Sequence, residues 1–129
     1  MSGTVKDINE RTFLETIKAS DKLVVVEFYL TTCPNCIAIA PVYEALSKEL
    51  QDKAVFTKIN AQENMGVSSQ YGIMATPTFK FFCKEQPIGE LVGAVNETML
   101  RNTIKDLIRH RSECTSKSTK LIFEIDGYA

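Results

Sequence analysis

Apolar runs divide the chain into short segments and predict the strands of a sheet. Residues 23–30 and 54–60 are rich in β-branched and aromatic side chains. Such runs are typical of buried strands, and the first, which is almost wholly apolar, predicts a central strand covered on both faces. Three shorter strands are expected at 4–8, 76–83 and 88–92, with a turn at 84–87 joining the last two as a hairpin.

Between these runs, apolar residues recur at the spacing of helix faces and predict four helices, at 10–20, 34–51, 63–71 and 97–110. Asn9 and Asn96 are suited to cap the first and last of them. Pro34 can occupy a first helical position, and Pro41 should kink the helix that contains it. The inward faces are expected to carry Ile37, Ala40, Leu46 and Leu50 in the second helix, and Met99, Leu100, Thr103, Ile104, Leu107 and Ile108 in the last.

The order strand, helix, strand over residues 23–60 predicts a βαβ unit. Such a unit requires a parallel pair of strands and a right-handed crossover, which places the chain in the α/β class.

Composition narrows the range of functions. The chain has 129 residues, of which 44% are hydrophobic and 24% charged, and a net charge of −1. This predicts one domain at 1–111, with residues 112–129 as an extension packed on it. A near-neutral charge disfavours nucleic-acid binding, and the absence of an apolar leader or a long apolar span disfavours secretion and membrane insertion. We therefore expect a cytoplasmic protein.

The chemistry most evident in the sequence is a pair of cysteines, Cys33 and Cys36, where the central strand meets the following helix. A thiolate at a helix N-terminus is stabilised by the helix dipole and by free N–H groups, here those of Asn35 and Cys36. Cys33 is therefore the expected nucleophile, with a modestly lowered pKa. Cys36 should be more buried and protonated, and should resolve the mixed disulfide that Cys33 forms.

Other interpretations of this pair are a structural disulfide, half of a zinc site and two inert core thiols. A reducing compartment disfavours the structural disulfide. No second CxxC follows, which disfavours a metal site. The position of the pair in a βαβ unit favours redox chemistry without any cofactor other than a Cys33–Cys36 disulfide.

Together with residues further along the chain, this motif resembles the thioredoxin family over residues 1 to about 110. The shared features occur in the family's order: an acidic residue followed by two aromatic residues at Glu27, the CxxC, a helix proline at Pro41, a strand lysine at Lys58, and a glycine at Gly93. The run Thr76-Pro77-Thr78 resembles the family's cis-proline signature.

This resemblance implies a thioredoxin fold, with a central mixed five-stranded sheet flanked by four helices. It also implies a cis Pro77 beside the cysteines, where the Thr76 backbone can pair with an extended substrate. The substrate-binding surface would then be flat and mostly apolar, and would include Pro34, Asn35, Met74, Ala75, Thr76, Val92, Gly93 and Ala94.

The resemblance further implies that Glu27 is buried beneath the cysteines and helps to move the Cys36 proton, with Lys58 moderating the cost of its charge. A solvent-exposed position for each of these two residues is the simpler alternative. The implied activity is reduction or exchange of protein disulfides, with electrons from a thioredoxin-reductase-type donor.

Some positions depart from the family pattern. The chain has no tryptophan; Thr32 and Tyr29 occupy positions where the family usually has one. The Cys-Pro-x-Cys order is more like glutaredoxins, so a glutathione-dependent reductase is one alternative, although no glutathione motif follows Pro77. A non-catalytic binding module with the same fold is another.

The remaining cysteines and the C-terminal segment carry weaker signals. Cys83 and Cys114 are expected to be ordinary thiols, with a regulatory bridge between them as the alternative. The alternating run 121–126 is a candidate extra strand. We expect a monomer.

Overall fold

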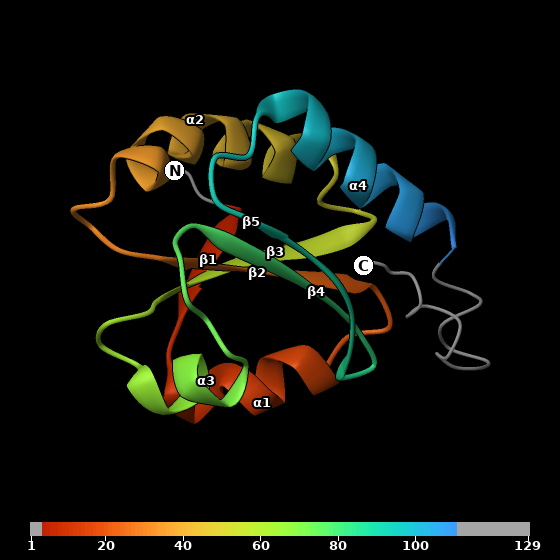
Figure 1. The fold of residues 1–129 in the computed structure, drawn as a ribbon. Helices are drawn as coiled ribbons and strands as arrows, with labels where there is room; N and C mark the ends of the chain where they lie inside the picture. Colours follow the sequence, from red (N-terminus) through yellow and green to blue (C-terminus); the bar gives the residue numbers. More distant parts are fainter. Residues whose placement is uncertain (1–3, 111–129) are drawn as a thin grey trace.

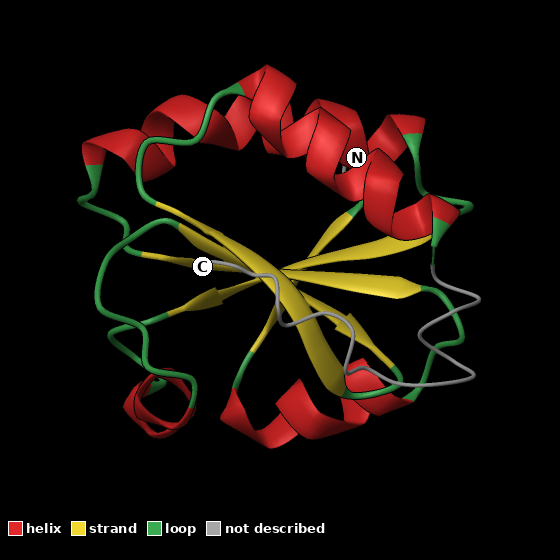
Figure 2. Ribbon diagram, turned by 45° about the vertical axis from the view of Figure 1, so that its right-hand side comes forward, coloured by secondary structure: helices red, strands yellow, loops and turns green. Residues whose placement is uncertain are grey.

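The computed structural model describes residues 4–110, in which a five-stranded sheet lies between two pairs of helices (Figures 1 and 2). The elements follow the expected order, which confirms the predicted fold class. The 112–129 extension, its candidate strand and Cys114 lie outside the described residues. The elements are β1 (Val5–Ile8), α1 (Glu10–Lys18), β2 (Leu23–Tyr29), α2 (Pro34–Glu49), β3 (Ala54–Asn60), α3 (Met65–Gln70), β4 (Thr78–Cys83), β5 (Gln86–Val92) and α4 (Glu97–Arg109).

The sheet is mixed, with strand order β1-β3-β2-β4-β5. β3 pairs in parallel with both β1 and β2, whereas β4 runs antiparallel to β2 and to β5. β2 is therefore central, and every residue in it except Tyr29 is buried. This explains why its sequence is almost uniformly apolar.

Helices cover both faces of the sheet. Figure 1 shows α2 and α4 on one face and α1 and α3 on the other. Residues of β2 alternate between the two faces: Val25 packs in the cluster with α2 and α4, while Val24 and Val26 pack in the other cluster. Glu27 follows Val25 by two positions, so its side chain lies on the face that α2 covers.

The predicted inward face of α2 is only partly right. Leu46 is buried, but Ile37 and Ala40 are exposed. The buried positions are instead Cys36, Ile39, Tyr43, Leu46 and Ser47. Cys36 and Ile39 are buried, and a residue one position later on a helix is turned by about 100°, which directs Ile37 and Ala40 towards solvent.

Two further details differ from the sequence predictions. Met99 in α4 is exposed, because Leu100 and Ile104 define the centre of the buried face. The hairpin turn is shorter than expected, since Lys84 and Glu85 have positive φ values of 50° and 63° and β5 already begins at Gln86. Two central residues with positive φ are the geometry of a tight two-residue hairpin turn.

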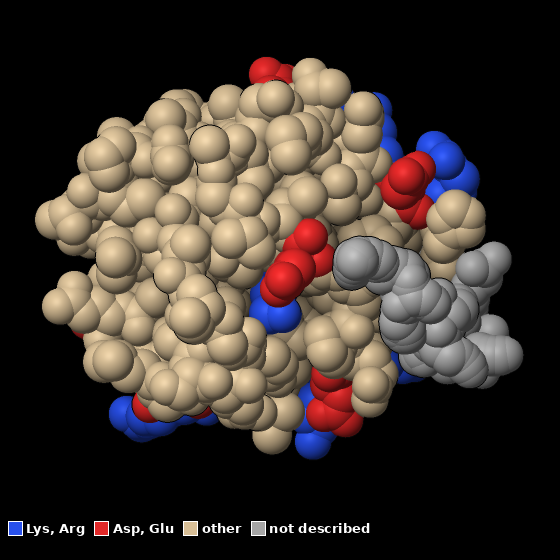
Figure 3. Space-filling model, viewed as in Figure 1, with Lys and Arg blue, Asp and Glu red and all other residues tan. Residues whose placement is uncertain are grey.

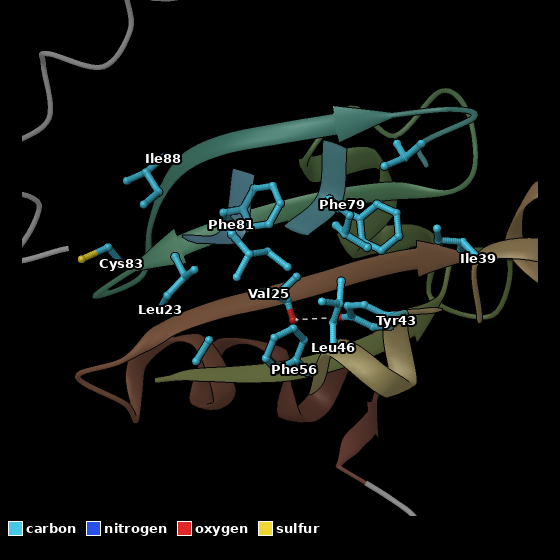
Figure 4. Close-up of a cluster of buried hydrophobic side chains, with 14 residues drawn as sticks. Leu23, Val25, Ile39, Tyr43, Leu46, Phe56, Phe79, Phe81, Cys83 and Ile88 are labelled. Atoms are coloured by element: carbon cyan, nitrogen blue, oxygen red, sulfur yellow. Dashed lines mark hydrogen bonds between the residues drawn. The ribbon is translucent and has the colours of Figure 1, made fainter. Parts of the chain in front are cut away.

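Tyr43 connects α2 to the centre of the sheet. Its ring packs edge-on against Phe56 and Phe79, and its hydroxyl lies 2.6 Å from the Thr57 carbonyl oxygen and 3.3 Å from that of Val25 (Figure 4). The side chain is fully buried, so this hydroxyl has no access to water as a substitute partner.

We expect Tyr43→Phe to lower the free energy of unfolding by about 1–2 kcal/mol, because a hydrogen bond to a buried carbonyl is lost while the ring packing remains. Tyr71→Phe is the matched control: that ring also packs against two phenylalanines, but its hydroxyl makes no hydrogen bond within the described part of the chain. Equal denaturation midpoints for the two variants would contradict this role.

Candidate functional site

Cys33 occupies the N-cap position of α2, directly after the turn that ends β2. Its N–H donates to the Leu30 carbonyl at 3.4 Å, and Pro34 begins the helix. The Cys33 Sγ accepts a hydrogen bond from the Cys36 N–H at 3.2 Å. The sulfur therefore takes the place that a serine or aspartate oxygen takes at other helix starts.

This environment lowers the pKa of Cys33. Burial alone would raise it, but hydrogen bonds from the Cys36 and Thr76 side chains and from the Cys36 and Asn35 backbone outweigh that effect. A lowered pKa of Cys33 was predicted from the sequence, as were the two backbone N–H groups, of Asn35 and Cys36, that contribute to it. Cys33 is partly accessible, and its lowered pKa makes it the more readily ionised thiol of the pair.

Cys36 has the opposite character. It is only 4% exposed, and burial together with its hydrogen bond to Cys33 raises its pKa to about 11. The pair thus combines an accessible thiol of lowered pKa with a buried thiol that holds its proton, and both are free thiols in this structure.

A second segment, more than forty residues further along, lies against Cys33. The Cys33 thiol donates to the Thr76 carbonyl, with Sγ and O 3.4 Å apart, and the Thr76–Pro77 peptide bond is cis, as the resemblance implied. The Gly93 N–H donates to the Pro77 carbonyl at 2.8 Å, which holds the end of β5 next to this segment. Gly93 has φ +88°, a conformation that favours glycine.

The surface around Cys33 is apolar and carries little charge. Met74 is 93% exposed, Ile37 is 62% exposed, and Val92, which pairs with Thr78 next to Pro77, is also exposed. Figure 3 shows a broad uncharged area on the left of the molecule, over the start of α2 and the adjoining loops, while the charged side chains gather elsewhere in this view. Exposed apolar side chains grouped on one face are typical of a surface that binds other proteins.

A hollow of about 360 Å³ extends this surface towards α3. Its lining includes Met65, Met74, Ala75 and Thr76, so it opens next to the segment that contacts Cys33. It offers room for an apolar side chain on one side of the reactive sulfur.

Glu27 lies in the interior, on the face of β2 that α2 covers. It is 3% exposed, and burial raises its pKa from the ordinary 4.5 to about 7, an effect that Lys58 partly offsets. Lys58 is the cross-strand partner of Glu27 in β3. The burial predicted for Glu27 is therefore present, and it makes the carboxyl able to take up and release a proton near neutral pH.

The thioredoxin family model matches residues 4–106 of the chain. The chain belongs to the thioredoxin family. It is 35% identical to Thioredoxin H4 of Arabidopsis thaliana over 71% of this chain and 77% of that one, and 35% identical to Thioredoxin 1 of Synechococcus elongatus over 75% and 91%. The crystal structure of a thioredoxin from Malassezia sympodialis aligns with a TM-score of 0.75 at 33% identity, covering 83% of this chain and 93% of that one.

Membership in the thioredoxin family makes the chain a thiol–disulfide oxidoreductase that acts on protein disulfides. Within residues 4–110 no three His, Cys, Asp or Glu side chains are grouped to bind a metal, and no helix there is long and apolar enough to cross a membrane. Cys83, by contrast, is buried and disulfide-bonded, so the expectation of an ordinary free thiol is wrong for that residue.

The structure brings most of the predicted site residues together at one edge of the sheet. Cys33, Cys36, Thr76, Pro77 and Gly93 are linked by the contacts described above. Pro34 and Asn35 open α2 at the surface; Val92 pairs with Thr78, next to Pro77, and Ala94 follows Gly93. Glu27 and Lys58 lie in the sheet rather than on the surface of the site.

Two contributors were missed in the sequence. Ile37 was expected to face inward, whereas its exposure adds it to the apolar surface. Met65, the first residue of α3, lines the hollow. Both side chains are apolar, and the sequence alone does not show how each helix is rotated against the sheet. That rotation decides which apolar side chains are exposed.

Proposed function

We propose that the chain reduces disulfides of other proteins by cycling Cys33 and Cys36 between dithiol and disulfide. The observation that carries this proposal is the contrast within the pair: the accessible sulfur has a lowered pKa, and the buried sulfur behind it has a pKa of about 11. This contrast orders the two steps of the exchange, because the accessible sulfur loses its proton more readily than the buried one and therefore attacks first.

In the first step the Cys33 thiolate attacks one sulfur of the substrate disulfide. A bond forms between Cys33 Sγ and that sulfur, the substrate S–S bond breaks, and the second substrate sulfur leaves as a thiolate that takes a proton from water. In the second step Cys36 loses its proton, attacks Cys33 Sγ and releases the other substrate thiol. Two electrons have then moved from Cys33 and Cys36 to the substrate.

Glu27 is proposed to accept the Cys36 proton in the second step. Cys36 with a pKa of about 11 is almost fully protonated at neutral pH, so it needs a base. The carboxyl of Glu27, with a pKa of about 7, is partly ionised there and lies on the face of the sheet that α2 covers. Lys58, beside it, moderates its proton affinity.

Substrates are proposed to bind as extended segments along Thr76 and Pro77, flanked by the ends of β5 and α2. The substrate-contacting set is Pro34, Asn35, Met74, Ala75, Thr76, Val92, Gly93 and Ala94. Main-chain pairing of this kind accepts many sequences, which suits a protein that acts on several disulfides. A reductase-type donor would return the electrons to the Cys33–Cys36 disulfide, in a reducing compartment such as the cytoplasm. The chain would act as a monomer and would need no further cofactor.

The proposal is tested by reduction of insulin disulfides with dithiothreitol as the electron source, followed by the turbidity of the released chains. We expect the chain to accelerate this reduction strongly over dithiothreitol alone. A parallel reaction driven by glutathione alone separates the glutaredoxin-like alternative, which predicts the greater acceleration there. If neither reaction were accelerated, the proposal would be rejected in favour of a non-catalytic binding module.

A further inference from the structure

Lys58 lies between two carboxylates on adjacent strands. It is the register partner of Glu27 in β2 and of Asp7 in β1, so all three side chains fall on the face of the sheet that α2 covers. Asp7 is exposed at the sheet edge, whereas Glu27 is buried. Lys58 therefore lies in register between a buried and an exposed carboxylate, and its charge lowers the pKa of the buried one.

Tyr29 fixes where the Lys58 ammonium sits. The Nζ lies 5.2 Å from the centroid of the Tyr29 ring, a distance typical of a cation–π contact, and the Tyr29 hydroxyl lies 3.5 Å from Asp7 Oδ2. Within residues 4–110 no ion pair joins Lys58 to Glu27. The ammonium thus lies over a ring whose hydroxyl is next to Asp7, and the pKa of Glu27 remains raised despite the nearby positive charge.

We propose that Asp7 and Tyr29 are positioning residues for the proton-transfer step: by holding Lys58 away from Glu27, they keep Glu27 in proton exchange near neutral pH. This inference rests on the proposed role of Glu27. It extends the proton-transfer machinery to the edge strand β1, which lies outside both the cysteine motif and the proposed substrate surface.

The direction of the effect follows from the charges around Glu27. β1 brings Asp7, β3 brings Lys58, the loop after β3 brings Glu63 near Tyr29, and α2 carries Tyr43 on its buried face, close enough to feel the charge of Glu27. The β4 partner of Glu27 is apolar Phe79. Removing the Asp7 charge takes away a repulsion and also frees Lys58 to approach Glu27, and both changes favour the ionised carboxyl.

The test is a direct titration of the Glu27 carboxyl carbon by NMR in ¹³C-glutamate-labelled protein, with Glu27→Gln to assign the signal. In Asp7→Asn the titration midpoint should fall by about half a pH unit or more, the size expected for a charge roughly two strand spacings away. In Lys58→Met the midpoint should rise. The matched control is Asp21→Asn, which removes an exposed carboxylate paired with Lys84 at the opposite end of β2.

A Glu27 midpoint that is unchanged in Asp7→Asn but raised in Lys58→Met would overturn the inference and leave the proposed function intact. A fall of the same size in Asp21→Asn would also overturn it, since any lost negative charge would then suffice. Insulin reduction tests the proposed function separately. Even if the chain were inactive in that assay, the titration would still show whether Asp7 affects the titration midpoint of Glu27.

Discussion

Cys33→Ser is expected to lower the catalysed part of insulin reduction, which is the rate above that with dithiothreitol alone, by at least about 1,000-fold. The serine hydroxyl is not ionised near neutral pH, so the variant has no nucleophile at the helix start. Cys36 cannot replace it, because that thiol is buried and its pKa is raised to about 11. The initial rate of insulin reduction at neutral pH measures the loss.

Cys36→Ser provides the matched comparison, because it removes the other sulfur and leaves the first step possible. This variant should also lose turnover, but it should accumulate a mixed disulfide between Cys33 and the substrate, visible by mass spectrometry. If Cys33→Ser trapped substrate and Cys36→Ser did not, the order of attack would be the reverse of the one proposed here.

Glu27→Gln is expected to stabilise the protein by about 3 kcal/mol above pH 8 and to have little effect near pH 4. In the folded chain burial raises the pKa of Glu27 from 4.5 to about 7. The folded state therefore binds the proton more tightly than the unfolded state, and stability is lost as the pH rises from about 4.5 through 7. Each pH unit of that difference corresponds to about 1.4 kcal/mol.

Urea denaturation of the wild type and of Glu27→Gln at pH 4 and pH 8 measures this effect. The matched control is Glu15→Gln, an exposed position on α1 that should leave the pH dependence of stability unchanged. A Glu27→Gln variant with the same loss of stability at high pH as the wild type would show that the buried carboxyl is not the group responsible. The same variant should turn over more slowly at neutral pH, since it lacks the proposed base.

Local signals made much of this fold predictable. These signals act within a few residues of the chain, and each has the predicted role in the structure: the almost wholly apolar run of β2, Asn9 and Asn96 at helix starts, and Pro34 at a first helical position. Cys33 could be placed for the same reason, because its environment depends on the helix that begins immediately after it.

What could not be predicted depends on contacts between distant segments. The approach of Thr76 to Cys33 followed only from the family resemblance. The exposure of Ile37 depends on how α2 is rotated against the sheet, which its apolar residues alone do not decide. The shared position of Lys58 between Asp7 and Glu27 requires the register of three strands, and no local pattern specifies that register.

The reduction potential of the cysteine pair tests the central claim most directly. The chain is equilibrated in defined glutathione buffers, free thiols are alkylated, and the modified peptides are identified by mass spectrometry. We predict that Cys33 and Cys36 lose their thiols together in one two-electron transition at about −200 to −270 mV. If the two cysteines oxidised independently, or stayed reduced across the whole range, a reversible couple at the start of α2 would be contradicted.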